Sequence, residues 1–262
     1  MGHRYPYLST APPIAFAHRG GAATGAENTI GTFAHAVDLG YRYLETDVRA
    51  TTDGVAVVFH DATLDRMTGY GGAIGELRWA DLASLRVGGA EVVPRLDDVL
   101  AAWPTIRFNL DAKSDQAVEP TVAAVRRGNA GDRVLLASFS DQRLDRLRRL
   151  TGATVATSLG IRGVTDLWLA ALTGRRVRLP AGVVAAQVPR RRRRLPVVTG
   201  RFLRHCHRHG LQVHVWTIDA AADMHDLLDL GVDGIMTDEP ATLRAVLQAR
   251  GHWPAGTPGG AG

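Results

Sequence analysis

The sequence of 262 residues is poor in lysine and in cysteine. Lys113 is the only lysine among its 31 basic residues, so all the others are arginine. The one cysteine, Cys206, excludes an intramolecular disulfide framework and a cysteine-rich zinc site. No run approaches the roughly 18 apolar residues that a membrane-spanning helix needs, and the first twenty residues lack the layout of a signal peptide. These absences predict a cytoplasmic protein.

The single lysine is informative because the two basic side chains differ in shape. An ammonium is a compact point charge, whereas a guanidinium is a wide planar fork. Where arginine has replaced lysine almost everywhere, the lysine that remains indicates a position that arginine does not fill. Lys113 is therefore a candidate functional residue.

The basic charge is modest and mostly spread along the chain. The net charge is +5, and the one dense run is Arg190–Arg194. No zinc-finger spacing, RNA-binding aromatic motif or leucine zipper accompanies it, so we do not expect a nucleic-acid partner. The run is interpreted as a solvated basic loop. Contact with an anionic membrane surface is the alternative, which we do not favour because no amphipathic membrane helix is apparent. The oligomeric state is left open.

Short β-rich runs alternate with amphipathic stretches along the whole chain. Eight such pairs in about 250 residues predict a (β/α)₈ TIM barrel spanning residues 12–250, with flexible termini at 1–11 and 251–262. An open doubly wound sheet is less favoured, since the first run lacks a glycine-rich dinucleotide fingerprint. The predicted strands are Ile14–Ala17, Tyr43–Val48, Ile106–Leu110, Val134–Ala137, Thr154–Thr157, Val183–Val188, Gln212–Trp216 and Gly234–Met236.

One segment interrupts the alternation. The Asp53-Gly54 pair between two β-rich runs indicates a hairpin. We therefore expect Val55–Phe59 to pair back on the second strand. The glycine-rich residues 62–94 then form a small loop-rich insertion over one barrel end.

Polar residues gather where the predicted strands end, which is where barrels place catalytic groups. Glu45 and Asp47 are two apart on a strand, so both side chains point to the same face. A divalent cation would relieve their mutual repulsion, and Asp111 on the next parallel strand would supply a third oxygen. Such a ligand set suits Mg²⁺ or Ca²⁺ better than Zn²⁺. The alternative is a salt-bridged pair with Arg42 or Arg49.

Two histidines reach the same rim. The hairpin places His60 beside Asp47, and His18 ends the neighbouring strand. Histidines on two sides of a reacting centre can take and give protons near neutral pH. Arg19 and Lys113 add two cations, which together with a metal describe a phosphoryl site. The absence of a P-loop disfavours nucleotide-dependent transfer, so phosphodiester hydrolysis is expected.

Ten short motifs occur in order, and with them the chain resembles the glycerophosphodiester phosphodiesterases. The resemblance covers His18 to Leu247. The motifs are His18-Arg19-Gly20, Glu27-Asn28-Thr29, Glu45-Thr46-Asp47-Val48, Asp53-Gly54, Val58-Phe59-His60-Asp61, Leu64-Asp65-Arg66 with Thr68-Gly69, Asp111-Ala112-Lys113, Ser138-Phe139, Val215-Trp216-Thr217, and Gly231-Val232-Asp233-Gly234 with Thr237-Asp238-Glu239-Pro240.

The resemblance implies a metal-dependent enzyme of lipid and glycerol metabolism that releases glycerol 3-phosphate and an alcohol. It implies His18 and His60 as the acid–base pair, and Arg19 and Lys113 on the phosphate. A divalent ion would be held by Glu45, Asp47 and Asp111, although the family usually carries glutamate at position 111.

The resemblance also implies roles around the phosphate. Glu27 would orient His18 or the substrate, Asn28 would cap the first helix, and Phe139 and Trp216 would form an apolar wall. A neighbouring hydroxyl of glycerol would be the first nucleophile, giving a cyclic phosphate that water opens.

Two alternatives remain. Related barrels cleave lysophospholipid or other lipid headgroups, so the same site could serve a phospholipase-type phosphodiesterase. A phosphodiester- or phospholipid-binding protein without activity is disfavoured, because both histidines and all the acids are present.

Overall fold

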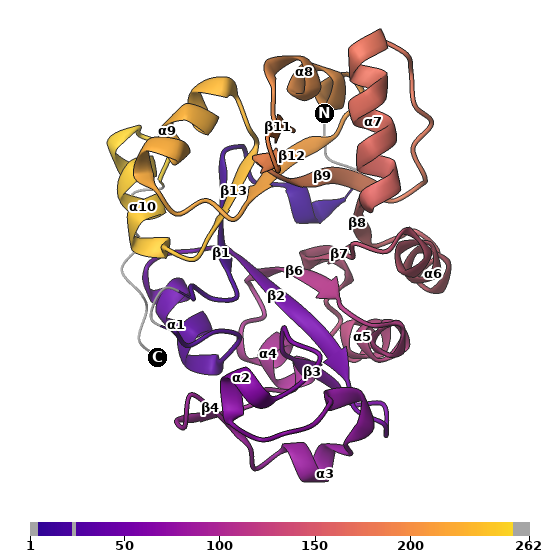
Figure 1. Cartoon of the computed structure of the whole chain (residues 1–262), viewed down its shortest axis with the longest axis vertical. Coiled ribbons are helices and arrows are strands. Elements are labelled where there is room, and N and C mark those ends of the chain that lie inside the picture. Colours follow the sequence, from indigo (N-terminus) through magenta and orange to yellow (C-terminus); the bar gives the residue numbers. More distant parts are fainter. Residues whose placement is uncertain (1–4, 23–24, 254–262) are drawn as a thin grey trace.

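The structure is a computed structural model that describes residues 5–22 and 25–253. Eight parallel strands close into a barrel, because β1 pairs with both β13 and β2 (Figure 1). The predicted barrel is confirmed and the open sheet is excluded. The barrel strands are β1 (Ile14–His18), β2 (Tyr43–Ala50), β6 (Arg107–Ala112), β7 (Val134–Ala137), β8 (Ala156–Ser158), β9 (Val183–Pro189), β12 (Gln212–Trp216) and β13 (Gly234–Thr237).

Helices follow the strands and cover the barrel from outside. Side-chain caps fix several of their starts: the hydroxyls of Ser140 and Thr199 accept hydrogen bonds from amides in the first turns of α6 and α8. Proline begins α10, where a missing amide hydrogen does no harm. The helices are α1 (Ile30–Asp38), α4 (Leu96–Ala102), α5 (Val118–Arg127), α6 (Asp141–Thr151), α7 (Ile161–Thr173), α8 (Gly200–Arg208), α9 (Ala221–Leu230) and α10 (Pro240–Ala249). Two 3₁₀ turns join them to the sheet, η3 (Asp115–Ala117) and η4 (Gly131–Arg133).

The predicted hairpin is present. Strand β3 (Ala56–Val58) runs antiparallel to β2, with Val48 opposite Val58, and the amide of Phe59 donates to the carbonyl of Asp47. This register brings the chain back to the rim just before His60, as the position of the turn predicts.

The insertion that follows contains only short elements around its own apolar cluster, which includes Leu64, Ile74 and Leu82. In Figure 1 it lies at the opposite end of the view from α7 and α8. Its elements are α2 (Asp65–Thr68), η2 (Ile74–Glu76), α3 (Trp79–Leu82), β4 (Arg86–Val87) and β5 (Glu91–Val92). The Glu91 carboxylate accepts hydrogen bonds from Thr29 and from the Gly31 amide, so it ties the insertion to the start of α1.

The arginine run forms a second small hairpin, in which β10 (Arg191–Arg192) pairs with β11 (Leu195–Pro196). Arg190 at its base forms ion pairs with Asp223 and Asp226 of α9. These two ion pairs hold the predicted basic loop at Arg190, and residues 191–194 are exposed.

The core has an outer layer between helices and strands and an inner layer within the barrel. Residues 5–8, part of a terminus predicted to be flexible, belong to the inner layer. The turn η1 (Pro6–Leu8) buries Tyr7 and Leu8, and the hydroxyl of Tyr43 donates to the carbonyl of Tyr7 at 2.7 Å. Their aromatic and leucine side chains are buried against the barrel, and the flexibility predicted for residues 1–11 and 251–262 stays a prediction.

At the other terminus, Trp253 packs edge-on against Tyr41, with ring centroids 5.1 Å apart. Residues 1–4 and 254–262 lie outside the described ranges, and the limits 12–250 stay a prediction. Within the described ranges, no helix is both long and apolar enough to cross a bilayer.

Candidate active site

Strand register brings the predicted acids together at the carboxyl end of the barrel. His18 at the end of β1 is level with Glu45 of β2, and Asp47 is level with Asp111 of β6. All three carboxylates are buried. The even spacing on β2 points Glu45 and Asp47 to the same side, as predicted from the sequence.

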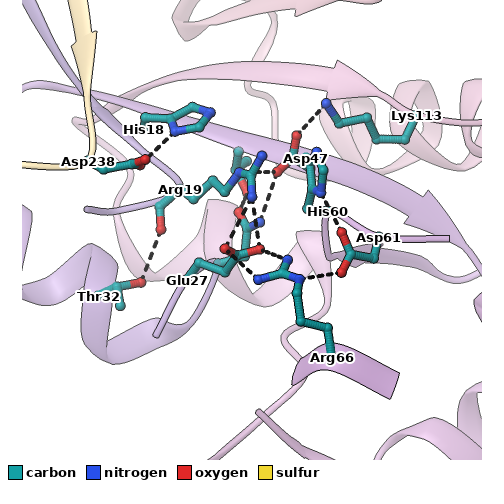
Figure 2. Close-up of polar contacts among 12 residues, drawn as sticks. His18, Arg19, Glu27, Thr32, Asp47, His60, Asp61, Arg66, Lys113 and Asp238 are labelled. Carbon is teal, nitrogen blue, oxygen red and sulfur yellow. Dashed lines mark hydrogen bonds and ion pairs between the residues drawn. The ribbon is translucent and has the colours of Figure 1, made fainter. Parts of the chain in front are cut away.

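Lys113 lies between two of these acids. Its Nζ atom is 2.7 Å from Oδ1 of Asp47 and 2.7 Å from Oδ2 of Asp111. Figure 2 shows the contact of Lys113 with Asp47, and the role of this lysine on the phosphate stays a prediction. In this arrangement the ammonium neutralises carboxylates instead of facing open solvent.

Arg19 forms the centre of a second network (Figure 2). Its Nη1 atom donates to both oxygens of Glu27 at 3.0 and 3.1 Å, and its Nε lies 3.2 Å from Oδ2 of Asp47. Arg66, from the insertion, contacts the other side of Glu27 at 2.6 Å and also binds Asp61. Glu27 was predicted to orient His18 or the substrate. Among the described residues its carboxylate binds Arg19 and Arg66 and makes no contact with His18, and a role toward the substrate stays a prediction.

Asn28 has a different role from the predicted helix cap. The cap of α1 is Thr29, whose hydroxyl accepts from the amide of Thr32. Asn28 adopts a left-handed backbone conformation, with φ of 57°, and its side-chain nitrogen donates to Asp47 at 3.0 Å. The hydroxyl of Thr46 donates to its side-chain oxygen at 2.7 Å. Asn28 thus helps to fix the orientation of Asp47.

Each candidate catalytic histidine has an aspartate on its Nδ1 atom. The distance is 2.7 Å from His18 to Asp238 and 2.6 Å from His60 to Asp61 (Figure 2). A carboxylate at this position favours a proton on Nδ1 and fixes the ring plane, so Nε2 is left for chemistry. The sequence prediction had not assigned these roles to Asp61 and Asp238, although both stand in the motifs that follow their strands.

Burial and crowding shift the acids in different directions. Burial and the neighbouring Asp47 raise the pKa of Glu45 to about 7. Burial also raises the pKa of Asp111, despite its contact with Lys113. Burial opposes ionisation of Asp47 as well, but Lys113 and Arg19 outweigh it and lower the pKa of Asp47. For His18, burial lowers the pKa, yet Glu45 and Asp238 together raise it above its ordinary value.

The raised pKa values of Glu45 and Asp111 indicate that burial of these two carboxylates is not offset by nearby positive charge. Oδ1 of Asp111 is buried and has no hydrogen-bond partner in the described structure. A buried carboxylate oxygen without a partner is costly, and a divalent cation would satisfy it. The donor chemistry of Glu45, Asp47 and Asp111 therefore fits a cation. Their present placement is not a ready coordination shell: among residues 5–22 and 25–253, no three acidic, histidine or cysteine side chains form a group that could hold a metal.

A cavity of about 630 Å³ opens above the acids. His18, His60 and Lys113 line its charged side, and Phe139 and Trp216 line the other. The two aromatic rings meet edge-on with centroids 5.5 Å apart. Lys113 also lies over the Phe139 ring, 5.5 Å from its centroid. The predicted apolar wall is thus placed beside the predicted phosphate site.

The carboxyl end of this (β/α)₈ barrel brings together two cationic side chains, two oriented histidines and a cluster of buried acids. This arrangement is typical of a hydrolase of phosphate esters. Comparison with known proteins narrows this class. The model of the glycerophosphoryl diester phosphodiesterase family matches residues 18–242. The chain belongs to this family and is a phosphoric diester hydrolase.

Individual relatives agree in length and fold. A Mycobacterium tuberculosis protein named probable glycerophosphodiester phosphodiesterase 2 is 44% identical over 252 residues, which is 94% of this chain and 95% of the relative. The glycerophosphodiester phosphodiesterase structure from Agrobacterium tumefaciens has a TM-score of 0.73 at 24% identity, with coverage of 90% and 99% of the two chains. A phosphodiesterase from Oleispira antarctica, solved with its product sn-glycerol-3-phosphate, has a TM-score of 0.77 at 21% identity and covers 90% of this chain and 97% of its own.

Proposed function

We propose that the chain hydrolyses small glycerophosphodiesters to glycerol 3-phosphate and an alcohol by acid–base catalysis with His18 and His60. The observation that carries the proposal is the paired arrangement of these rings, each with Nδ1 held by an aspartate and both lining one cavity. The product bound in the Oleispira antarctica relative is the one expected for this reaction.

The two Nε2 atoms would carry the proton transfers. One accepts the proton of the attacking hydroxyl as its oxygen bonds to phosphorus. The other donates a proton to the alkoxide as the bond from phosphorus to the departing oxygen breaks. Whichever histidine takes which role, the pair is then ready for a second step. If the glycerol hydroxyl attacked first, water opens the resulting cyclic phosphate in that step. Arg19 and Lys113 would stabilise negative charge on the phosphoryl oxygens.

A divalent cation, Mg²⁺ or Ca²⁺, would be held by Glu45, Asp47 and Asp111. Bound there, it would supply positive charge to a phosphoryl oxygen. Lys113 would then have to give up part of its contact with Asp47 and Asp111, and its ammonium would become available to the phosphate. The proposal is supported by the unpartnered Oδ1 of Asp111.

The test is release of glycerol 3-phosphate from glycerophosphocholine and glycerophosphoethanolamine, each with Mg²⁺, Ca²⁺ or EDTA. We expect turnover with a metal and its loss in EDTA. Asp111→Asn should need at least about tenfold more metal for half-maximal activity, whereas the exposed Asp166→Asn should match the wild type. No turnover on any such diester would refute the substrate, and turnover unaffected by EDTA would refute the cation.

The cellular setting stays a prediction from the sequence. We propose a cytoplasmic enzyme with a small-molecule substrate and no nucleic-acid partner. Fractionation of cells that produce the full chain tests the location, and recovery in the membrane pellet would contradict it.

A further inference from the structure

A hydrogen bond between two amide side chains crosses the interior of the barrel below the acids. The side-chain nitrogen of Gln187 on β9 donates to Oδ1 of Asn109 on β6 at 3.1 Å. Strands β7 and β8 lie between these two strands in the sheet, so the bond spans the barrel interior. Asn109 is level with Glu45 and two residues before Asp111, which places it one layer deeper than that acid. Both amides line the catalytic cavity and form part of its floor. We call Gln187 and Asn109 the amide pair.

A buried histidine sets the orientation of the Gln187 amide. Nδ1 of His214 lies 3.4 Å from the Gln187 nitrogen, and its Nε2 lies 3.0 Å from Oε1 of Gln212. Burial lowers the pKa of His214 to about 3, so the ring is neutral and carries one proton. We assign that proton to Nε2, because the oxygen of Gln212 can only accept a hydrogen bond. Nδ1 is then an acceptor, which the NH₂ group of Gln187 satisfies.

This arrangement uses the donors of Gln187 and leaves its acceptor available. The two hydrogens of its NH₂ group go to Asn109 and His214, and its Oε1 accepts no hydrogen bond within residues 5–22 and 25–253. Asn109 is the complement, because its Oδ1 is occupied and its NH₂ group has no partner among the same residues. Neither of these two groups is a buried orphan, so both are accessible from the cavity. The floor therefore offers one acceptor beside one donor.

An alcohol hydroxyl matches the amide pair, because it can donate one hydrogen bond and accept another. A hydroxyl that donates to Oε1 of Gln187 and accepts from the Asn109 nitrogen would satisfy both amides at once. Every glycerophosphodiester shares the glycerol moiety, which carries two hydroxyls. The hydroxyl next to the phosphate belongs at the histidines if it attacks phosphorus, so the terminal hydroxyl is the one left for the floor. The departing alcohol varies between substrates and needs no such fixed partner.

We propose that the amide pair is a hydroxyl-binding subsite, which recognises the terminal hydroxyl of glycerol and so selects glycerophosphodiesters from other phosphodiesters. This inference rests on the proposed function and assigns its substrate recognition to residues outside the charged network. A substrate without that hydroxyl would displace water from the floor and leave two amide groups without partners. Such a substrate should be discriminated against by about 10- to 100-fold.

The first test needs no variant. Glycerophosphoethanolamine is compared with an analogue in which 1,2-propanediol replaces glycerol, so that the terminal hydroxyl is lost and the one next to the phosphate is kept. We expect kcat/KM to be about 10- to 100-fold lower for the analogue. Equal kcat/KM for the two diesters would overturn the subsite.

The second test uses matched variants. Gln187→Met keeps the length of the side chain and removes its hydrogen-bonding groups. It should reduce the preference for glycerophosphoethanolamine over the analogue to about threefold or less, through slower reaction of the glycerol substrate. Gln142→Met is the control, because Gln142 is exposed on α6 and does not line the cavity. It should keep the preference of the wild type. If Gln187→Met slows both diesters by the same factor, its role is only structural and the proposal is wrong.

Binding of the products separates this inference from the proposed function. Glycerol 3-phosphate and 1,2-propanediol 1-phosphate are each titrated into the full chain with Mg²⁺ and followed by calorimetry. Glycerol 3-phosphate should bind at least about tenfold more tightly, and Gln187→Met should abolish the difference. That result without turnover of any diester supports the subsite while the proposed function fails. Turnover of the diester with equal binding of the two phosphates refutes the subsite alone.

Discussion

The two sides of the catalytic cavity differ in how their side chains are held. On the side of β1, β2 and β6, charged and polar partners hold the side chains in place, and Asp47 alone contacts Arg19, Asn28 and Lys113. On the side of α7 and the β10–β11 hairpin, apolar groups line the cavity without polar partners. Fixed charges favour catalysis that needs exact positions, whereas an apolar surface adapts to the shape of a ligand. The first side should therefore determine kcat and the second should determine binding.

The largest effect should follow loss of either histidine. His18→Ala and His60→Ala should each lower kcat at least about 100-fold, because each removes a proton-transfer group. The measurement is steady-state hydrolysis of glycerophosphoethanolamine. His35→Ala, an exposed change on α1, is the control and should retain full activity. Near-wild-type turnover by either active-site variant would remove that histidine from the mechanism.

The next largest effect should come from Lys113→Arg, which preserves the charge. The ammonium lies within 2.7 Å of two carboxylates, and a planar fork does not fit the same point. We expect kcat/KM to fall roughly tenfold. The reverse swap at an exposed site, Arg201→Lys, should change nothing. A fully active Lys113→Arg enzyme would mean that the lone lysine has no special role.

A smaller effect, and one on binding, should follow Trp216→Ala. Trp216 forms part of the aromatic wall with Phe139 and lines the same cavity as the charged groups. Its loss should raise KM by about three- to tenfold through reduced apolar contact and leave kcat within about twofold. If kcat collapses instead and KM holds, the division between the two sides is wrong.

The smallest effect concerns stability and pH. Hydrogen bonds from Arg66 and His60 lower the pKa of Asp61 to about 2. A depressed carboxyl pKa stabilises the fold above the unfolded value near 4, and this contribution disappears as the pH falls toward 2. Asp61→Asn should therefore lower the free energy of unfolding at pH 5 by about 1 kcal/mol or less, since the pair is partly exposed.

The difference from wild type should shrink toward pH 3 in urea unfolding curves. The exposed Asp132→Asn serves as the control and should follow the wild type throughout. A deficit that stays constant from pH 5 to pH 3 would show that the carboxylate charge of Asp61 is not the cause.

The fold was predictable because buried parallel strands produce distinct β-rich runs, and all eight were identified. Glu45 and Asp47 were predictable too, since spacing along a strand fixes their common face. Contacts between distant parts of the chain were not. Asp238 reaches His18 only because β13 pairs with β1, 220 residues away in sequence. Arg66 meets Glu27 through the fold of the insertion, which no periodic pattern specifies.

Local backbone geometry limited the prediction as well. Asn28 looks like a helix cap from its place before α1. Its left-handed conformation turns the side chain toward Asp47 and leaves capping to Thr29. A residue of this type can satisfy either role, so the sequence alone does not distinguish them.

The single lysine makes the molecule unusually simple to label. Apart from an α-amino group, the sequence offers an amine-reactive reagent one target, Lys113. In the structure that amine forms ion pairs with Asp47 and Asp111. It is kept protonated, because the two carboxylates raise its pKa despite burial. Acylation of this one side chain would therefore be slow while both ion pairs are formed and faster whenever they break. The mass of the labelled protein would thus record, without any substrate, how often the catalytic centre rearranges.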